Sequence, residues 1–107
     1  MLLKNGDVII ADTAEDETVG KCCEIAGLND EKAISGLHTM PVRPMIKFAP
    51  AFLGYYMNSE SFRDQLIPLM QGTKVTSISK TAMQGPKLIY PEDKDEQKNI
   101  ANYFFGT

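Results

Sequence analysis

The chain has 107 residues, 43% of them apolar, and a formal net charge of −3. This length suits one domain or part of one, and the apolar share excludes wholesale disorder. We find no run of 18 apolar residues and no signal-peptide pattern, so we expect neither a membrane span nor secretion. The only cysteines, Cys22 and Cys23, are adjacent, which disfavours a disulfide between them and fits a reduced, cytoplasmic setting.

The charges are distributed unevenly along the sequence. Residues 32–91 hold seven cations and two acids, a balance of +5, whereas the two ends together carry −8. An acidic protein with this asymmetry is able to present one cationic face. The simpler interpretation is chance clustering.

The first 44 residues have mostly β-type composition. A turn at Gly6-Asp7 precedes the continuous apolar run 8–11, which predicts a strand. The acidic stretch 13–21 predicts an exposed loop, 21–27 a short strand and 28–32 a turn. Residues 33–44 are β-like but contain Pro41. We therefore expect this strand to lie near an edge of the sheet or to end at Thr39 to Met40.

The next section is helical. Pro50 predicts a helix start, and Phe52, Leu53, Tyr56 and Met57 then form one apolar stripe. Ser59 is the expected N-cap of a second helix, which Pro68 should kink or end.

The C-terminal part alternates again between strand and helix. Residues 85–91 read as a strand between two turn signals, and 92–104 as a helix with acids in its first turn. Strands and helices do not alternate strictly, so the sequence predicts an α+β fold with a small mixed or antiparallel sheet and two or three helices.

The sequence offers little material for catalysis. His38 is the only histidine and is more typical of a satisfied polar residue than of a catalytic group. One histidine and two adjacent cysteines do not complete a zinc site, and no phosphate-binding loop is present. The acids of 12–17 are more typical of a solvated loop than of a paired-carboxylate hydrolase. We therefore expect no enzyme activity, no cofactor and no metal.

The stretch "QGTKVTSISK" (71–80) contains seven small polar or cationic residues and no carboxylate. Lysines neutralise phosphates, and short hydroxyls bond phosphate oxygens and base edges. Arg43, Lys47, Arg63 and Lys87 would widen such a footprint. The predicted DNA-binding residues are Gly72, Thr73, Lys74, Thr76, Ser77, Ser79, Lys80 and Arg43. A solvated surface loop has a similar composition.

Three blocks resemble a known family. "LKNGDVIIA", "FLGYYMNSESFRDQL" and "GTKVTSISKTAMQGPKLIYPEDKDEQKNIANYF" are together similar to the target recognition domain of the specificity subunit of type I restriction–modification enzymes. The last block is the most telling. The resemblance implies a specificity-domain-like fold in which residues 1–91 form a partial recognition domain and 92–107 begin the conserved spacer helix.

The resemblance also implies a function. Such subunits catalyse nothing; they read one half of a split site in double-stranded DNA and bring methyltransferase and restriction subunits to it. Gly72, Lys74, Ser77, Ser79 and Lys80 match the polar segment that the family presents towards DNA.

Compared with the family pattern, we expect this chain to lack the N-terminal portion of the domain and a second recognition domain. Missing strands would expose a sheet edge, which invites a homodimer. The alternative function is therefore a self-associating protein–protein module. Its interface would use the aromatic residues Phe52, Tyr55, Tyr56, Phe62, Tyr103 and Phe104, which at helical spacing are more often core.

Overall fold

The computed structural model describes residues 2–14, 18–29, 31–72 and 75–105, with side chains as far as Asn102. The strands are β1 (Val8–Ala11), β2 (Thr13–Ala14), β3 (Cys22–Glu24), β4 (Thr39–Val42) and β5 (Thr76–Ser77). The helices are α1 (Phe52–Met57), α2 (Glu60–Leu66) and α3 (Lys94–Phe105), with short 3-10 turns η1 (Ile67–Leu69) and η2 (Ala82–Gln84). The predicted α+β class is confirmed. Within the described residues, no helix combines the length and apolar character needed to cross a membrane.

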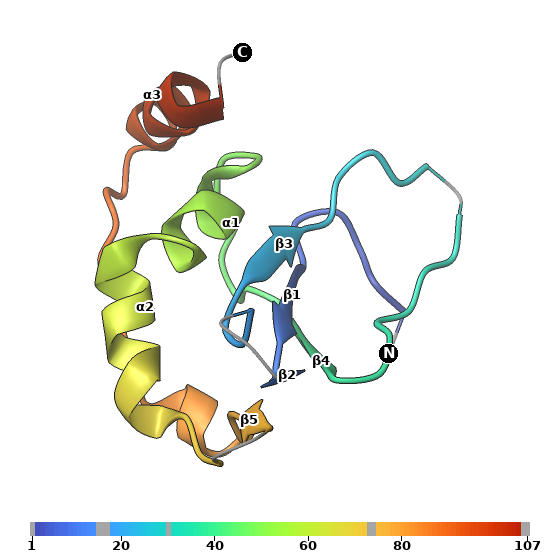
Figure 1. Ribbon diagram of the computed structural model, residues 1–107. Coiled ribbons are helices and arrows are strands. Elements are labelled where there is room, and N and C mark those ends of the chain that lie inside the picture. The colour runs from blue at the N-terminus through green and yellow to red at the C-terminus, as the bar shows by residue number, and fades with distance from the viewer. Residues whose placement is uncertain (1, 15–17, 30, 73–74, 106–107) are drawn as a thin grey trace.

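The main sheet has three antiparallel strands in the order β3-β1-β4. The continuous apolar run predicted as a strand is its central strand, and Val8 and Ile10 are completely buried. Figure 1 shows the three helices on one side of this sheet. The core that joins sheet and helices is a cluster of Val8, Ile10, Val19, Leu53, Met57, Phe62, Leu66 and Ile78.

Strand β4 is at an edge of the sheet, as Pro41 predicts, but it does not end at Thr39 to Met40. It starts at Thr39 and includes the proline. Pro41 lies opposite Ile9, whose polar backbone groups face β3. The missing N–H of Pro41 therefore faces away from the sheet, and no ladder bond is lost.

A second, two-stranded ribbon is formed by β2 and β5, with Thr13 opposite Ser77 and Ala14 opposite Thr76. The loop predicted for 13–21 is wrong at these first two residues. The ribbon is tied to the core by Ile78, which is buried and whose N–H donates to the Asp12 carbonyl at 2.9 Å. The polar residues of β5 thus form a strand because they pair with β2 and are followed by the buried Ile78.

The helical section follows the sequence closely. Ser59 caps α2 by accepting a hydrogen bond from the Phe62 N–H, and α2 ends before Pro68, as predicted. Helix α1 lacks a side-chain cap of its own. Instead the Glu24 carboxylate of β3 accepts from the N–H groups of Ala51 and Gly54 at 2.5 and 2.8 Å. The aromatic residues Phe52 and Phe62 are buried, which places them in the core.

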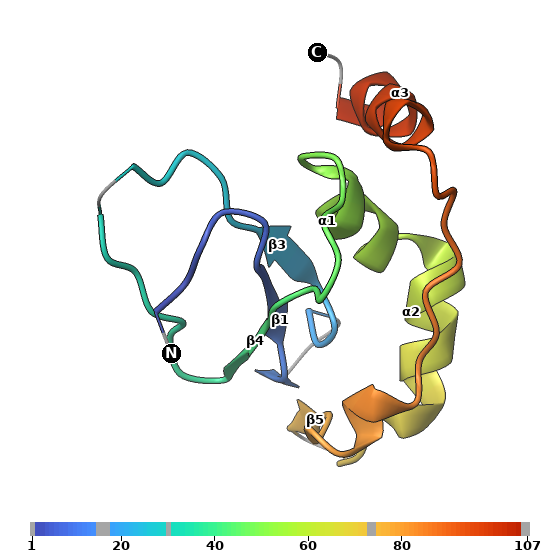
Figure 2. The same cartoon turned by 180° about the vertical axis from the view of Figure 1, so that it is seen from behind.

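The strand predicted for residues 85–91 does not form. The side chain of Gln65 on α2 both donates to and accepts from the backbone of Lys87, at 2.9 and 2.7 Å, and the Tyr56 hydroxyl accepts from Ile89. These side chains satisfy backbone groups that a neighbouring strand would otherwise pair. Figure 2 shows this segment running along α2 before the chain enters α3.

Candidate nucleic-acid interface

The described part of the polar segment 71–80 includes β5 of the β2–β5 ribbon. Gln71 and Ser77 exchange two backbone hydrogen bonds, at 2.9 and 2.8 Å, and so close the segment at its base. Gly72 has a φ of 110°, and a side-chain carbon placed there would collide with the Val75 carbonyl. Glycine is therefore required by the turn itself, and not only by the approach of a ligand.

The hydroxyls of the segment differ in their availability. Thr76 and Ser77 are half-buried in the ribbon. Ser79 is exposed, but its Oγ accepts from the Ala82 N–H at 3.1 Å and so supports the turn into η2. Ser79 thus has a local structural role beside the binding role predicted for it. Its hydroxyl proton is still free to be donated, since this bond uses only an oxygen lone pair.

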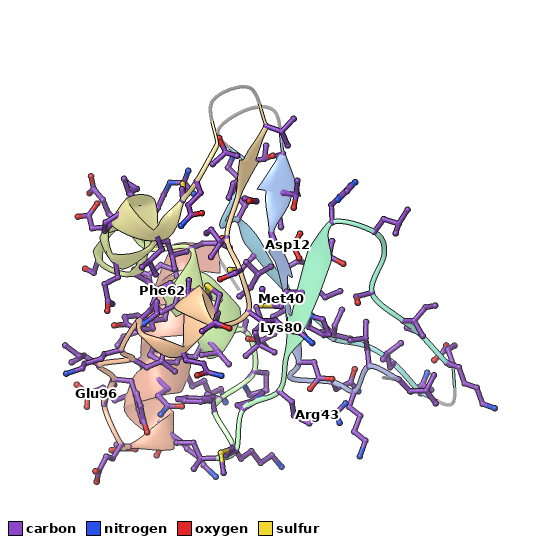
Figure 3. The ribbon with its side chains drawn as sticks, turned by 90° about the horizontal axis from the view of Figure 1, so that it is seen from below. Asp12, Met40, Arg43, Phe62, Lys80 and Glu96 are labelled. Carbon is purple, nitrogen blue, oxygen red and sulfur yellow. The ribbon has the colours of Figure 1, made fainter. Side chains whose placement is uncertain are left out.

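The predicted cations do not all come together. Lys80 is exposed beside the ribbon, and Lys87 is exposed further along the same stretch. Thr73 and Lys74 lie outside the described residues. Figure 3 places Arg43 at the end of β4, away from the β2–β5 ribbon. This separation follows from the sheet register, because Val42 pairs with Val8 at the start of β1 whereas β2 follows the end of β1.

Arg43 is committed to a structural ion pair. Its Nε and Nη2 donate to the two carboxylate oxygens of Asp7 at 3.0 and 2.8 Å, and Nη2 also donates to the Leu2 carbonyl at 2.9 Å. Asp7 is only 2% exposed. The hydrogen bond from Arg43 is the main cause that lowers the pKa of this carboxyl, with help from the Lys4 backbone N–H. We therefore remove Arg43 from the candidate interface.

The two cysteines and the histidine lie outside the polar segment 71–80. Among the described residues, no group of three histidine, cysteine or carboxylate side chains is gathered that would hold a metal ion. Cys22 and Cys23 are both free thiols, as predicted, and burial raises the pKa of Cys22 to about 12. The Cys22 thiol is therefore protonated near neutral pH and is a poor nucleophile. His38 is exposed in a turn with a φ of 59°.

Two features of the site were not predicted. The first is the β2–β5 pairing, which a two-residue strand in a polar sequence does not announce. The second is the ion pair between Asp7 and Arg43, which are 36 residues apart and carry no shared motif. Comparison with known proteins adds no relative: no protein-family model and no curated protein matches this chain.

Proposed function

We propose that this chain is the DNA-reading module of a type I restriction–modification specificity subunit. In this role it catalyses nothing and works in the cytoplasm. It contacts one half of a split site in double-stranded DNA and directs methyltransferase and restriction subunits there. The proposal combines the resemblance of the sequence blocks with the geometry of the segment 71–80.

The observation that carries the proposal is an acid-free stretch displayed on the surface. No carboxylate occurs between Asp64 and Glu92. Within this stretch Lys80 and Lys87 are exposed, and β5 pairs with β2. Exposed lysines attract phosphates, and the hydroxyls and backbone groups beside them fix the register on a duplex.

The test is a selection from a randomised duplex pool, performed with the chain alone and with the methyltransferase subunit added. We expect a common half-site to be enriched, and we expect retention to fall steeply with salt because bound phosphates release counterions. Enrichment only with the methyltransferase would still support the role within the complex. Absence of enrichment in both arms would contradict the proposal.

The alternative, a self-associating module without DNA binding, is favoured by a different observation. Ile34 and Leu37, close together in the segment before β4, are 72% and 90% exposed. Large exposed apolar side chains mark interaction surfaces when they are contiguous. Sedimentation over a range of protein concentrations separates the two functions, since an apolar dimer persists at high salt and forms without DNA.

A further inference from the structure

A groove of about 610 Å³ lies between the turn at residues 4–7, the end of β3 and the segment 43–50. Pockets that bind small molecules commonly have volumes of about 300–1,000 Å³, and their walls are mainly apolar with a few polar groups. Arg43 and the residues that follow it line the groove, which lies away from the β2–β5 ribbon. Ligand binding in this groove would therefore be independent of DNA binding at the ribbon.

The wall of the groove is apolar and partly open to water. Met45 is fully exposed and Ile46 is 51% exposed, while Phe48 and Leu53 line the same groove from more buried positions. A ligand with an apolar body would remove Met45 and Ile46 from water, which is favourable in proportion to the area covered. The unbranched methionine adapts its shape to such a ligand.

The charges that line the groove are unevenly compensated. Asp7 is bound by Arg43 through two hydrogen bonds, so these two charges neutralise each other. Glu24 is directed at the N–H groups of Ala51 and Gly54 at the start of α1. Its carboxylate is therefore already satisfied by hydrogen bonds within the fold.

Two lysines complete the lining. Lys4 and Lys47 are both exposed, and within the described part of the chain neither ammonium group forms an ion pair. The lining holds three cations (Lys4, Arg43 and Lys47) and two carboxylates (Asp7 and Glu24), so the groove combines an apolar wall with a net charge of +1. An ammonium group and a carboxylate form a charge-assisted hydrogen bond, so this combination selects an anionic partner.

We propose that this groove binds a small amphiphile with an apolar body and a carboxylate head. Lys4 and Lys47 hold the carboxylate, and the wall formed by Met45, Ile46 and Phe48 covers the apolar body. The volume matches one small ligand, and the charge of the head group is complementary to the two lysines.

Dodecanoate is a suitable probe below its micelle concentration, with binding followed by calorimetry and by backbone amide shifts. Dodecyl maltoside and dodecyltrimethylammonium supply a neutral and a cationic head on the same tail. We expect saturable binding of one dodecanoate, and weaker binding of both comparison compounds. The double variant Lys4→Gln/Lys47→Gln should bind dodecanoate about tenfold more weakly, since two exposed ion pairs together contribute about one such factor.

The matched control is Lys80→Gln/Lys87→Gln, which removes two exposed lysines outside the groove and should bind dodecanoate as the wild type does. All four lysines are exposed, so both double variants should fold, which circular dichroism checks. Absence of saturable binding would overturn the proposal. Equal binding of the neutral compound, or an unchanged affinity of Lys4→Gln/Lys47→Gln, would also overturn it. An acidic, apolar peptide that binds this groove where dodecanoate does not would identify a protein partner instead.

Discussion

The side-chain amide of Asn58 pairs with the backbone of Cys22 in both directions. The Cys22 N–H donates to Oδ1 at 2.7 Å, and Nδ2 donates to the Cys22 carbonyl at 2.8 Å. The backbone N–H and C=O of Cys22 point away from β1, because the backbone hydrogen bonds between β1 and β3 are made by residues on either side of it, such as Lys21 and Ile25. The amide therefore occupies the position of a further strand. At the opposite edge, Pro41 offers no outward N–H, so neither edge favours pairing with a second copy.

We predict that Asn58→Ala both destabilises the fold and opens this edge. The free energy of unfolding should fall by about 1 kcal/mol, because one backbone donor and one acceptor lose their protein partner. Self-association should increase, because the outer edge of β3 becomes available. Urea unfolding and light scattering measure the two effects. Asn99→Ala on the exposed surface of α3 is the control and should change neither quantity; an identical result for both variants would contradict the capping role.

The ion pair between Asp7 and Arg43 predicts a pH dependence of stability. Asp7 has a lowered pKa in the folded protein, so its contribution is present above the unfolded value near 3.8 and is lost as pH falls through the lower folded value. Asp7→Asn should therefore cost about 2 kcal/mol near neutral pH, as expected for a hydrogen-bonded charge, and progressively less below about pH 4. Denaturant midpoints of both proteins at several pH values measure this difference.

Arg43→Ala tests the cause of that dependence. Because the hydrogen bond from Arg43 is the largest cause of the lowered pKa, adding Asp7→Asn to Arg43→Ala should produce a much smaller pH-dependent difference. A difference of unchanged size and pH dependence would show that Arg43 is not the group responsible. DNA affinity should survive Arg43→Ala in any variant that remains folded.

Gly72→Ala is expected to disturb the polar turn. Its φ of 110° is unfavourable for alanine, and the added carbon would meet the Val75 carbonyl. A cost of about 1–3 kcal/mol is typical of such strain, and DNA affinity should fall with it if the turn contacts the duplex. Gly36→Ala is the matched control, because Gly36 has open space around it and is not in the left-handed region. Equal stability of the two variants would contradict the proposed role of the glycine.

The two cysteines should react with iodoacetamide at different rates. Cys22 is partly buried and its pKa is raised to about 12, whereas Cys23 is exposed. At about pH 8 one thiol should therefore be modified quickly, and the second only on unfolding. Cys23→Ser should remove the fast reaction and Cys22→Ser should retain it, as read by mass spectrometry. A fast reaction that survives Cys23→Ser would contradict the burial of Cys22.

The sequence predicted best those features that depend on neighbouring residues. The apolar run 8–11 forms the central strand. Helix α2 begins after the cap at Ser59 and ends before Pro68, as expected. An apolar run, a capping serine and a proline each act on the backbone within a few residues of their own position.

Contacts between distant residues decided the features that the sequence did not predict. Residues 85–91 have strand composition, but the side chains of Gln65 and Tyr56 pair with their backbone and leave no room for a ladder. β5 formed in a polar segment because β2 lies beside it. In the candidate interface, Arg43 and Lys80 share a positive charge in the sequence, but the structure pairs Arg43 with Asp7, a contact between residues 36 positions apart that no local pattern predicts.

The most direct test of the DNA-reading proposal is the salt dependence of binding to the duplex enriched from the randomised pool. Wild type, Lys74→Ala/Lys80→Ala and Lys94→Ala/Lys98→Ala are compared, the last pair removing two exposed lysines of α3. We predict that affinity falls steeply with salt and that the first variant reduces the logarithmic slope by about 2, weakening all sequences equally. The α3 variant should bind as wild type does. Salt-independent binding, or an unchanged slope in Lys74→Ala/Lys80→Ala, would contradict the proposal.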